Sequence, residues 1–297
     1  MNESSFDHTV LIGDCAAIRQ VRAEISSAAR TTATVLILGE TGVGKEIVSR
    51  LIHKESSRQR QPFVAINCGA TAETLLESEL FGHMKGSFTG AFHDRPGLIQ
   101  QAHRGTLFLD ELGEMSLRMQ AVLLRFAETR ELQRIGSPDA ARIDARLIAA
   151  TNRDLRTQVA SGQFRADLYY RLNVLQIHVP PLRERGGDVK ALLDYYLAQA
   201  AHCHQLPQPV LSPEAVQILV AYPWPGNIRE LRNIAERLIL QECEGTLTPD
   251  DLPREVLAPS PAVAARRVAI AGGTVRPAER VPLPQATIRR DFPEEMM

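Results

Sequence analysis

Short apolar runs alternate with amphipathic segments along the first half of the chain. Four of these runs have the length and composition of buried strands: 35–38, 62–67, 105–110 and 146–151. The segments between and before them repeat their apolar residues with the helical period: 16–30, 46–54, 72–81 and 115–128. Because strands that alternate with helices form parallel sheets covered by helices, the pattern predicts an α/β fold.

The pattern becomes purely helical from about residue 188. Three segments have helical periodicity: 189–202, 212–221 and 227–241. In the second of them, Ser212 is placed to cap the helix and Pro213 to occupy its first turn. After about residue 257 the chain is rich in Ala, Pro and Arg without a sustained period. We therefore expect three parts: an α/β subdomain over 8–185, a smaller all-α lid subdomain over 186–257, and a flexible tail over 258–297.

The overall composition is that of a globular protein. The chain has 297 residues, 44% of them hydrophobic, and a formal net charge of −1, which gives no global electrostatic reason to bind nucleic acid. No apolar run reaches the roughly 18 residues of a membrane span, and the N-terminus does not resemble a secretory signal. The four cysteines are scattered without a C-x-x-C pair, as in a reducing compartment. We expect a cytoplasmic protein that does not bind membranes.

A phosphate-binding pattern, G-x-x-x-x-G-K, runs from Gly39 to Lys45. It follows the first predicted strand and precedes a helix, an order that disfavours the alternative of a chance glycine-rich turn. Glycines let the backbone approach a phosphate, the helix N-terminus favours negative charge, and Lys45 supplies a mobile cation. The next residue is Glu46 instead of the usual Ser or Thr, so Mg²⁺ is expected to be held mostly from elsewhere.

Two carboxylates, Asp110 and Glu111, end the third predicted strand. Parallel strands deliver such residues to the carboxyl edge of the sheet, where the phosphate loop is also expected. Asp110 suits Mg²⁺, and Glu111 suits polarisation of an attacking water. The alternative, in which these acids only cap the following helix, becomes less attractive beside a phosphate loop.

Together these residues resemble the AAA+ P-loop ATPase domain of bacterial sigma-54-dependent transcription activators, over about residues 8–255. The most specific segment is 77–91, which contains a loop similar to the family's G-A-F-T-G-A loop, with Ser87 in place of Ala. The resemblance implies that this loop contacts sigma-54 through Gly86, Ser87, Phe88, Thr89, Gly90 and Ala91. A glycine-flanked, exposed Phe88 suits a mobile contact. The alternative is an ordinary turn with Phe88 packed inward.

Other segments match further parts of the family's machinery. Asn67 resembles the asparagine that hydrogen-bonds the catalytic Glu111 and links nucleotide state to the loop, and a neutral amide can hold a carboxylate without neutralising it. Asn152, after a strand, resembles the residue that senses the γ-phosphate, although a plain strand-end turn is the alternative. The segment 135–137 resembles a second surface loop with a supporting role.

Arginines in two more segments resemble catalytic arginines of the family. Arg165 and Arg171 match arginine fingers, which act on the nucleotide of a neighbouring subunit; each could instead form a surface ion pair with Asp167. Arg229, in a segment similar to W-P-G-N-x-R-E-L, resembles the lid arginine that closes on the phosphates. The same segment can also be read as a local turn with Asn227 as a helix cap.

The resemblance implies ATP as the nucleotide and Mg²⁺ held by Asp110. The implied catalytic residues are Asp110, Glu111, Asn67, Arg165 and Arg171. The implied nucleotide-binding residues are Gly39, Glu40, Thr41, Gly42, Val43, Gly44, Lys45, Glu46, Ile12, Gly13, Asn152 and Arg229.

The implied function is ATP-driven remodelling of sigma-54 RNA polymerase by a ring of subunits, expected to be a hexamer. Neither a sensing module before the ATPase nor a helix-turn-helix after the lid is recognisable, so we do not expect sequence-specific DNA binding by this chain. A full-length paralogue in a mixed ring could supply it. Two alternatives stay open: an AAA+ ATPase that acts on another protein or on DNA, and a regulatory subunit that joins the ring of a full-length activator.

Overall fold

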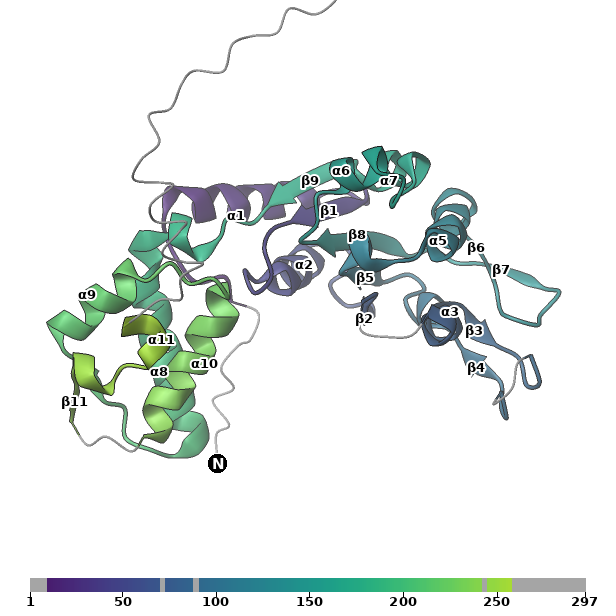
Figure 1. The fold of residues 1–297 in the computed structure, drawn as a ribbon. Coiled ribbons are helices and arrows are strands. Elements are labelled where there is room, and N and C mark those ends of the chain that lie inside the picture. The colour runs from purple at the N-terminus through teal and green to yellow at the C-terminus, as the bar shows by residue number, and fades with distance from the viewer. Residues whose placement is uncertain (1–9, 70–72, 88–90, 242–244, 258–297) are drawn as a thin grey trace, which may run out of the picture. The chain divides into compact units, whose positions relative to one another are not determined.

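A five-stranded parallel sheet forms the centre of the α/β part of the protein (Figure 1). The computed structural model describes residues 10–69, 73–87, 91–241 and 245–257. The strands follow the order β2, β5, β8, β1, β9, and each neighbouring pair is parallel. Their bounds are β1 (Val35–Leu38), β2 (Phe63–Asn67), β5 (Thr106–Asp110), β8 (Arg146–Thr151) and β9 (Leu175–His178). The predicted α/β fold is confirmed.

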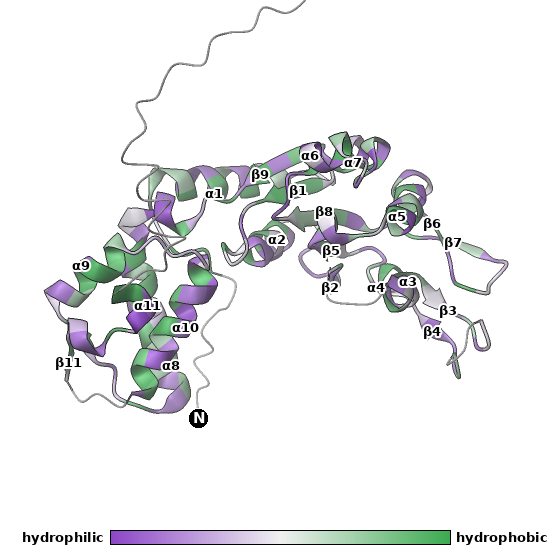
Figure 2. Cartoon of the chain, in the orientation of Figure 1, coloured by the Kyte–Doolittle hydropathy of each residue, from purple (hydrophilic) through white to green (hydrophobic). Residues whose placement is uncertain are grey.

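Helices cover both faces of this sheet. Val35 and Ile37 of β1 pack into one apolar cluster with residues of α1 (Ala16–Ala29) and α2 (Lys45–Lys54). Leu36, between them, packs into a second cluster, because successive strand residues face opposite sides. That cluster includes residues of α3 (Glu73–Phe81), α4 (Leu98–Gln101), α5 (Leu117–Thr129), α6 (Leu155–Ala160) and α7 (Ala166–Leu172). A strand buried on both faces is apolar throughout, as the colouring of β1 in Figure 2 shows.

The sequence pattern did not predict the fifth strand, β9. It pairs with β1 at the edge of the sheet and exposes alternate residues, with Ile177 buried and Gln176 and His178 exposed. A four-residue edge strand with one fully buried side chain gives only a weak apolar signal. The neighbouring strand, and not local composition, therefore determines its conformation.

Two small antiparallel ribbons lie beyond the sheet. One consists of β3 (Gly82–His83) and β4 (Arg95–Pro96), and it carries the predicted sigma-54 loop. The other consists of β6 (Glu131–Gln133) and β7 (Ala140–Arg142), and it carries the predicted second loop. The ribbons contact each other, because the Met84 N–H donates to the Ile135 carbonyl at 2.9 Å and the Ile135 N–H to the Gly82 carbonyl at 3.0 Å.

Helices that follow the sheet form a separate apolar cluster, here called the lid. It contains α8 (Val189–His204), α9 (Pro213–Ala221), α10 (Asn227–Leu240) and α11 (Arg254–Leu257), with the short strands β10 (Val210–Leu211) and β11 (Thr246–Leu247). The Ser212 hydroxyl accepts a hydrogen bond from the Ala215 N–H at 3.2 Å, so the predicted helix cap is confirmed. Within the described ranges, no helix combines the length and the apolar character needed to cross a bilayer.

Candidate active site

The phosphate loop joins β1 to α2 in a conformation that depends on two glycines. Gly42 has φ +81° and Gly44 has φ +99°, both in the left-handed region that favours glycine. Gly44 occupies the cap position of α2, so the first free N–H groups of this helix follow the loop directly. The Lys45 ammonium donates to the carbonyls of Gly39 at 2.9 Å and Glu40 at 3.0 Å. Burial lowers the pKa of Lys45, and the charges of Asp110 and Glu111 act in the opposite direction.

Polar residues at the ends of three adjacent strands meet beside this loop. Asn67 ends β2 and pairs in register with Asp110 at the end of β5, while Thr151 ends β8. The Asp110 carboxylate accepts the Glu111 N–H at 2.9 Å. Burial raises the pKa of Asp110, although that hydrogen bond and the Lys45 charge lower it. The carboxyl edge of the sheet thus brings Asp110, whose pKa is raised, close to the Lys45 ammonium.

Glu111 has an unusual backbone conformation for its residue type. Its φ of +54° lies in the left-handed region, which costs a non-glycine residue free energy. The turn after Asn67 packs against it, because a Cβ added to Gly69 would lie 2.6 Å from Glu111 Oε2. In that turn the Asn67 Oδ1 accepts the Gly69 N–H at 2.8 Å.

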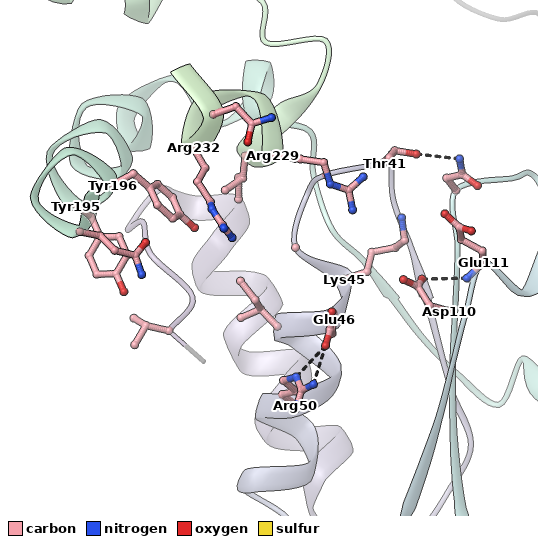
Figure 3. Close-up of a pocket in the computed structure, with 18 residues that line it drawn as sticks. Thr41, Lys45, Glu46, Arg50, Asp110, Glu111, Tyr195, Tyr196, Arg229 and Arg232 are labelled. Atoms are coloured by element: carbon pink, nitrogen blue, oxygen red, sulfur yellow. Dashed lines mark hydrogen bonds and ion pairs between the residues drawn. The ribbon is translucent and has the colours of Figure 1, made fainter. Parts of the chain in front are cut away.

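A cavity of about 710 Å³ opens between the phosphate loop, the strand ends and the lid (Figure 3). Nine residues implied by the resemblance line it: Thr41, Gly42, Gly44, Lys45, Glu46, Asp110, Glu111, Asn152 and Arg229. Figure 3 shows Tyr195 and Tyr196 on one side and Asp110 and Glu111 on the other. Arg232 lies beside Tyr196, so cations and aromatic rings both line the cavity, which suits a ligand that carries phosphates on an aromatic base.

Several cavity residues were not predicted from the sequence: Val10, Ile47, Arg50, Tyr195, Tyr196, Gln199, Ile228, Arg232 and Asn233. A signal for two of them was present, because Arg232 and Asn233 lie three and four residues after Arg229 and share its helix face. Tyr195 and Gln199 are likewise four residues apart on α8. Nothing in the sequence pattern indicated that α8 lines the cavity.

Glu46, at the position where Ser or Thr is usual, interacts with Arg50. The Arg50 guanidinium donates to one Glu46 oxygen at 2.7 and 3.0 Å.

Asn152 donates from Nδ2 to the Thr41 hydroxyl at 3.0 Å, which joins the end of β8 to the phosphate loop.

The remaining implied nucleotide-binding residues are not among those that line the cavity. Gly39, Glu40 and Val43 belong to the loop itself. Ile12 packs against the lid, its carbonyl accepts from Arg185 at 2.6 Å, and Gly13 follows it. Val10, slightly earlier in the chain, reaches the cavity.

The two candidate arginine fingers also lie outside the cavity of their own chain. Arg165 forms an ion pair with Asp167 through contacts of 3.1 and 2.7 Å, which is the alternative that the sequence left open. Arg171 donates to the Ala127 carbonyl at 3.2 and 3.0 Å. Within one chain, both therefore have other partners.

The predicted sigma-54 loop is described at its two ends, and Phe88, Thr89 and Gly90 lie outside the described residues. The Gly86 N–H donates to the Ala91 carbonyl at 2.8 Å, which closes the loop at its base. The Ser87 hydroxyl donates to the Met84 carbonyl at 2.8 Å. A Cβ added to Gly136, in the second loop, would lie 2.8 Å from Ser87 Cβ. The second loop therefore packs on the base of the first.

Asn227 does not cap α10 as one interpretation of the sequence proposed. The cap position belongs to Gly226, whose N–H donates to the Glu230 carboxylate at 2.8 Å. The Asn227 amide instead contacts the phosphate loop and the segment before α8. A local sequence pattern cannot reveal such partners, since they lie far away in the chain.

Comparison with known proteins agrees with this architecture. The Sigma-54 interaction domain model matches residues 11–178, and the AAA+ ATPase lid domain model matches residues 183–268. The crystal structure of NtrX from Brucella abortus in complex with ADP is similar with a TM-score of 0.78 and 32% sequence identity, covering 90% of this chain and 64% of that chain.

Curated relatives have names of transcription regulators. The Nif-specific regulatory protein of Azotobacter vinelandii is 47% identical over 241 residues, which are 81% of this chain and 46% of the relative. The transcriptional regulatory protein ZraR of Klebsiella oxytoca is 48% identical over 243 residues, which are 82% of this chain and 55% of the relative. The chain spans about half the length of these relatives. It belongs to the Sigma-54 interaction domain family of AAA+ proteins.

Proposed function

We propose that this chain hydrolyses ATP in a cytoplasmic ring of subunits and uses the hydrolysis to remodel sigma-54 RNA polymerase, so that transcription starts. The observation that carries the proposal is the cavity in which Lys45 of the phosphate loop, Asp110 and Glu111 converge. Membership of the Sigma-54 interaction domain family supports the choice of partner. The ADP complex of the similar NtrX structure supports the choice of nucleotide.

In this proposal, ATP lies with its phosphates at the loop and its base toward Tyr195 and Tyr196. The phosphate loop with Lys45 supports that orientation, because its cation favours phosphate, while the tyrosine rings offer apolar contact. Hydrolysis needs a water oxygen to attack the γ-phosphorus while the bond to the β–γ bridging oxygen breaks, which yields ADP and phosphate. Glu111 polarises that water and accepts its proton.

The residues present fit Mg²⁺ only together with a nucleotide. Among the described residues, no group of three or more His, Cys, Asp and Glu side chains could hold a metal ion. Mg²⁺ is usually bound by one or two carboxylates together with phosphate oxygens and water, and Asp110 supplies such a carboxylate. When bound, the ion neutralises charge on the phosphates.

Replacement of Glu111 by glutamine is expected to separate binding from hydrolysis. Gln keeps the size and one oxygen but cannot accept the proton, so turnover should fall by about 100-fold or more while ATP still binds. ATP affinity and phosphate release, measured on the same preparation, test this. A variant that turns over ATP at the wild-type rate would remove Glu111 from its role.

Replacement of Arg165 by alanine is expected to lower turnover at least about tenfold, because a guanidinium from the neighbouring subunit stabilises charge on the transferring phosphate. The ion pair with Asp167 is exposed, so breaking it should change stability little. The test mixes the Arg165→Ala and Glu111→Gln variants. If Arg165 acts in trans, some interfaces in mixed rings have both groups, and activity reappears. Mixtures no more active than their components would contradict action in trans.

A further inference from the structure

The side chain of Asn227 connects three segments that are far apart in the chain. It is fully buried at the start of α10, with φ +53°. Its Oδ1 accepts the Leu182 N–H at 2.8 Å, and its Nδ2 donates to the Thr41 carbonyl at 3.0 Å and to Glu40 Oε2 at 3.2 Å. Because the first partner donates and the other two accept, only one orientation of the amide satisfies them all.

The first turn of α10 lies directly on the phosphate loop. The N–H groups of Ile228 and Arg229 donate to the Gly42 carbonyl at 3.0 and 3.3 Å. A Cβ added to Gly42 would lie only 2.3 Å from the Gly226 carbonyl oxygen. A glycine at position 42 therefore serves two purposes. It lets the loop backbone approach a phosphate, and it leaves room for the lid, which packs closely on the loop.

Glu40 adds a charged contact between the phosphate loop and the segment before α8. Its carboxylate accepts two hydrogen bonds from Arg183, at 2.8 and 2.7 Å, in the paired geometry that arginine favours. Arg183 precedes α8 and follows Leu182, the partner of Asn227. The phosphate loop is thus held by the segment before α8 and by the start of α10.

These contacts fix the direction of two peptide groups in the loop. In a trans peptide, the N–H points away from the preceding carbonyl, so holding the Thr41 and Gly42 carbonyls toward the lid directs the N–H groups of Gly42 and Val43 the opposite way. Loops that bind anions need their N–H groups held in a defined direction. Arg229, whose own N–H is part of the same contact, is positioned together with the loop.

We propose that Asn227, with the ion pair of Glu40 and Arg183, is a positioning element that fastens the phosphate loop to the lid, so that the shape of the loop and the location of Arg229 are set together. Asn227 does not reach the reacting atoms in this proposal. The inference depends on the proposed function only in the experiments that measure ATP turnover.

The test starts from Asn227→Asp, an isosteric change. A carboxylate cannot donate to the Thr41 carbonyl, and it places a negative charge beside Glu40. We expect ADP affinity, measured by calorimetry with the full chain, to fall about tenfold or more, as for the loss of a buried hydrogen-bonding group. The KM for ATP should rise similarly, with a smaller change in kcat. A variant that is only less stable would show fewer active molecules, hence lower kcat at an unchanged KM.

A second variant gives the test a specific signature. Glu40→Gln alone weakens the contact with Arg183 and should cost about two- to fivefold in ADP affinity, as should Arg183→Gln. Combined with Asn227→Asp, however, Glu40→Gln removes one of two adjacent negative charges. The Asn227→Asp/Glu40→Gln double variant should therefore bind ADP several-fold more tightly than Asn227→Asp alone. Both Glu40 and Arg183 are partly exposed, so these single variants should fold even if Asn227→Asp does not.

Ser212→Ala is the matched control, because it removes the cap of α9 within the lid and does not contact the loop. It should lower the unfolding temperature and leave ADP affinity unchanged. Asn227→Asp with ADP affinity within about twofold of wild type, or a double variant weaker than either single, would overturn the inference. If Asn227→Asp does not fold, wild-type ADP affinity in both Glu40→Gln and Arg183→Gln would overturn it.

The outcomes also separate this inference from the proposed function. A wild-type chain that binds ADP but does not hydrolyse ATP would contradict the proposed function and leave the ADP test of the inference valid. A wild-type chain that hydrolyses ATP, with unchanged ADP affinity in Asn227→Asp, would contradict the inference alone. A wild-type chain that binds neither nucleotide would overturn both.

Discussion

The Lys45→Ala variant is expected to lose measurable ATP turnover, a fall of about 1,000-fold or to the background of the assay, and to lose most of its ADP affinity. Lys45 is the cation at the end of the phosphate loop, and its ammonium donates to the carbonyls of Gly39 and Glu40. Alanine removes the charge that would meet the phosphates, and it also removes the positive charge of Lys45 that interacts with Asp110 and Glu111.

The measurement is phosphate release together with ADP calorimetry on the folded variant. Lys190→Ala is the matched control, because Lys190 loses only an exposed ion pair with Asp194 on α8. That control should keep wild-type affinity and turnover. Normal turnover in Lys45→Ala would place the nucleotide site elsewhere in the chain.

The Phe88→Ala variant is expected to lose transcription activation while its ATPase rate stays within about twofold of wild type. Phe88 is the aromatic residue of the loop similar to G-A-F-T-G-A, and it lies outside the described residues. The described base of that loop belongs to the β3–β4 ribbon and not to the nucleotide cavity. Loss of the aromatic side chain should therefore remove the contact with sigma-54 and spare the chemistry.

Phe92→Ala provides a close control for this prediction. Phe92 is 75% exposed, lies four residues after Phe88 and belongs to the same ribbon connection, but it is outside the loop pattern. It should keep activation near the wild-type level. If Phe88→Ala activates normally, the contact with sigma-54 lies in another part of the surface; if it also stops hydrolysing ATP, the loop cannot be assigned a purely mechanical role.

The sequence predicted those elements whose signal is local. The runs 35–38 and 146–151 were predicted with the observed bounds, because a strand buried on both faces contains a continuous apolar run, here 35–38 and 147–150. β9 was missed, because an edge strand with one fully buried side chain has little apolar signal of its own. The conformation of such a strand depends on its neighbour in the sheet, which only the tertiary structure supplies.

In the candidate site, too, residues with a local sequence pattern were predicted, and residues placed by tertiary packing were missed. Lys45 belongs to the phosphate-binding pattern that follows β1, and Asp110 and Glu111 lie where the run of β5 ends. The structure brings these three residues together in one cavity. Tyr195 and Tyr196 have no such pattern, since their location in the cavity depends on how the lid packs on the phosphate loop. The partners of Asn227 were missed for the same reason: its amide bonds residues 45 and 186 positions away.

Remodelling of sigma-54 RNA polymerase is tested by ATP-dependent formation of open complexes on a sigma-54 promoter by the purified chain at high concentration, without upstream enhancer DNA. Open complexes are expected to form with ATP and wild-type protein. The Glu111→Gln variant, which should bind ATP but hydrolyse it slowly, is expected to form few of them. ATP hydrolysis by the wild-type chain without any open complexes would contradict the claim that this ATPase by itself remodels sigma-54 RNA polymerase.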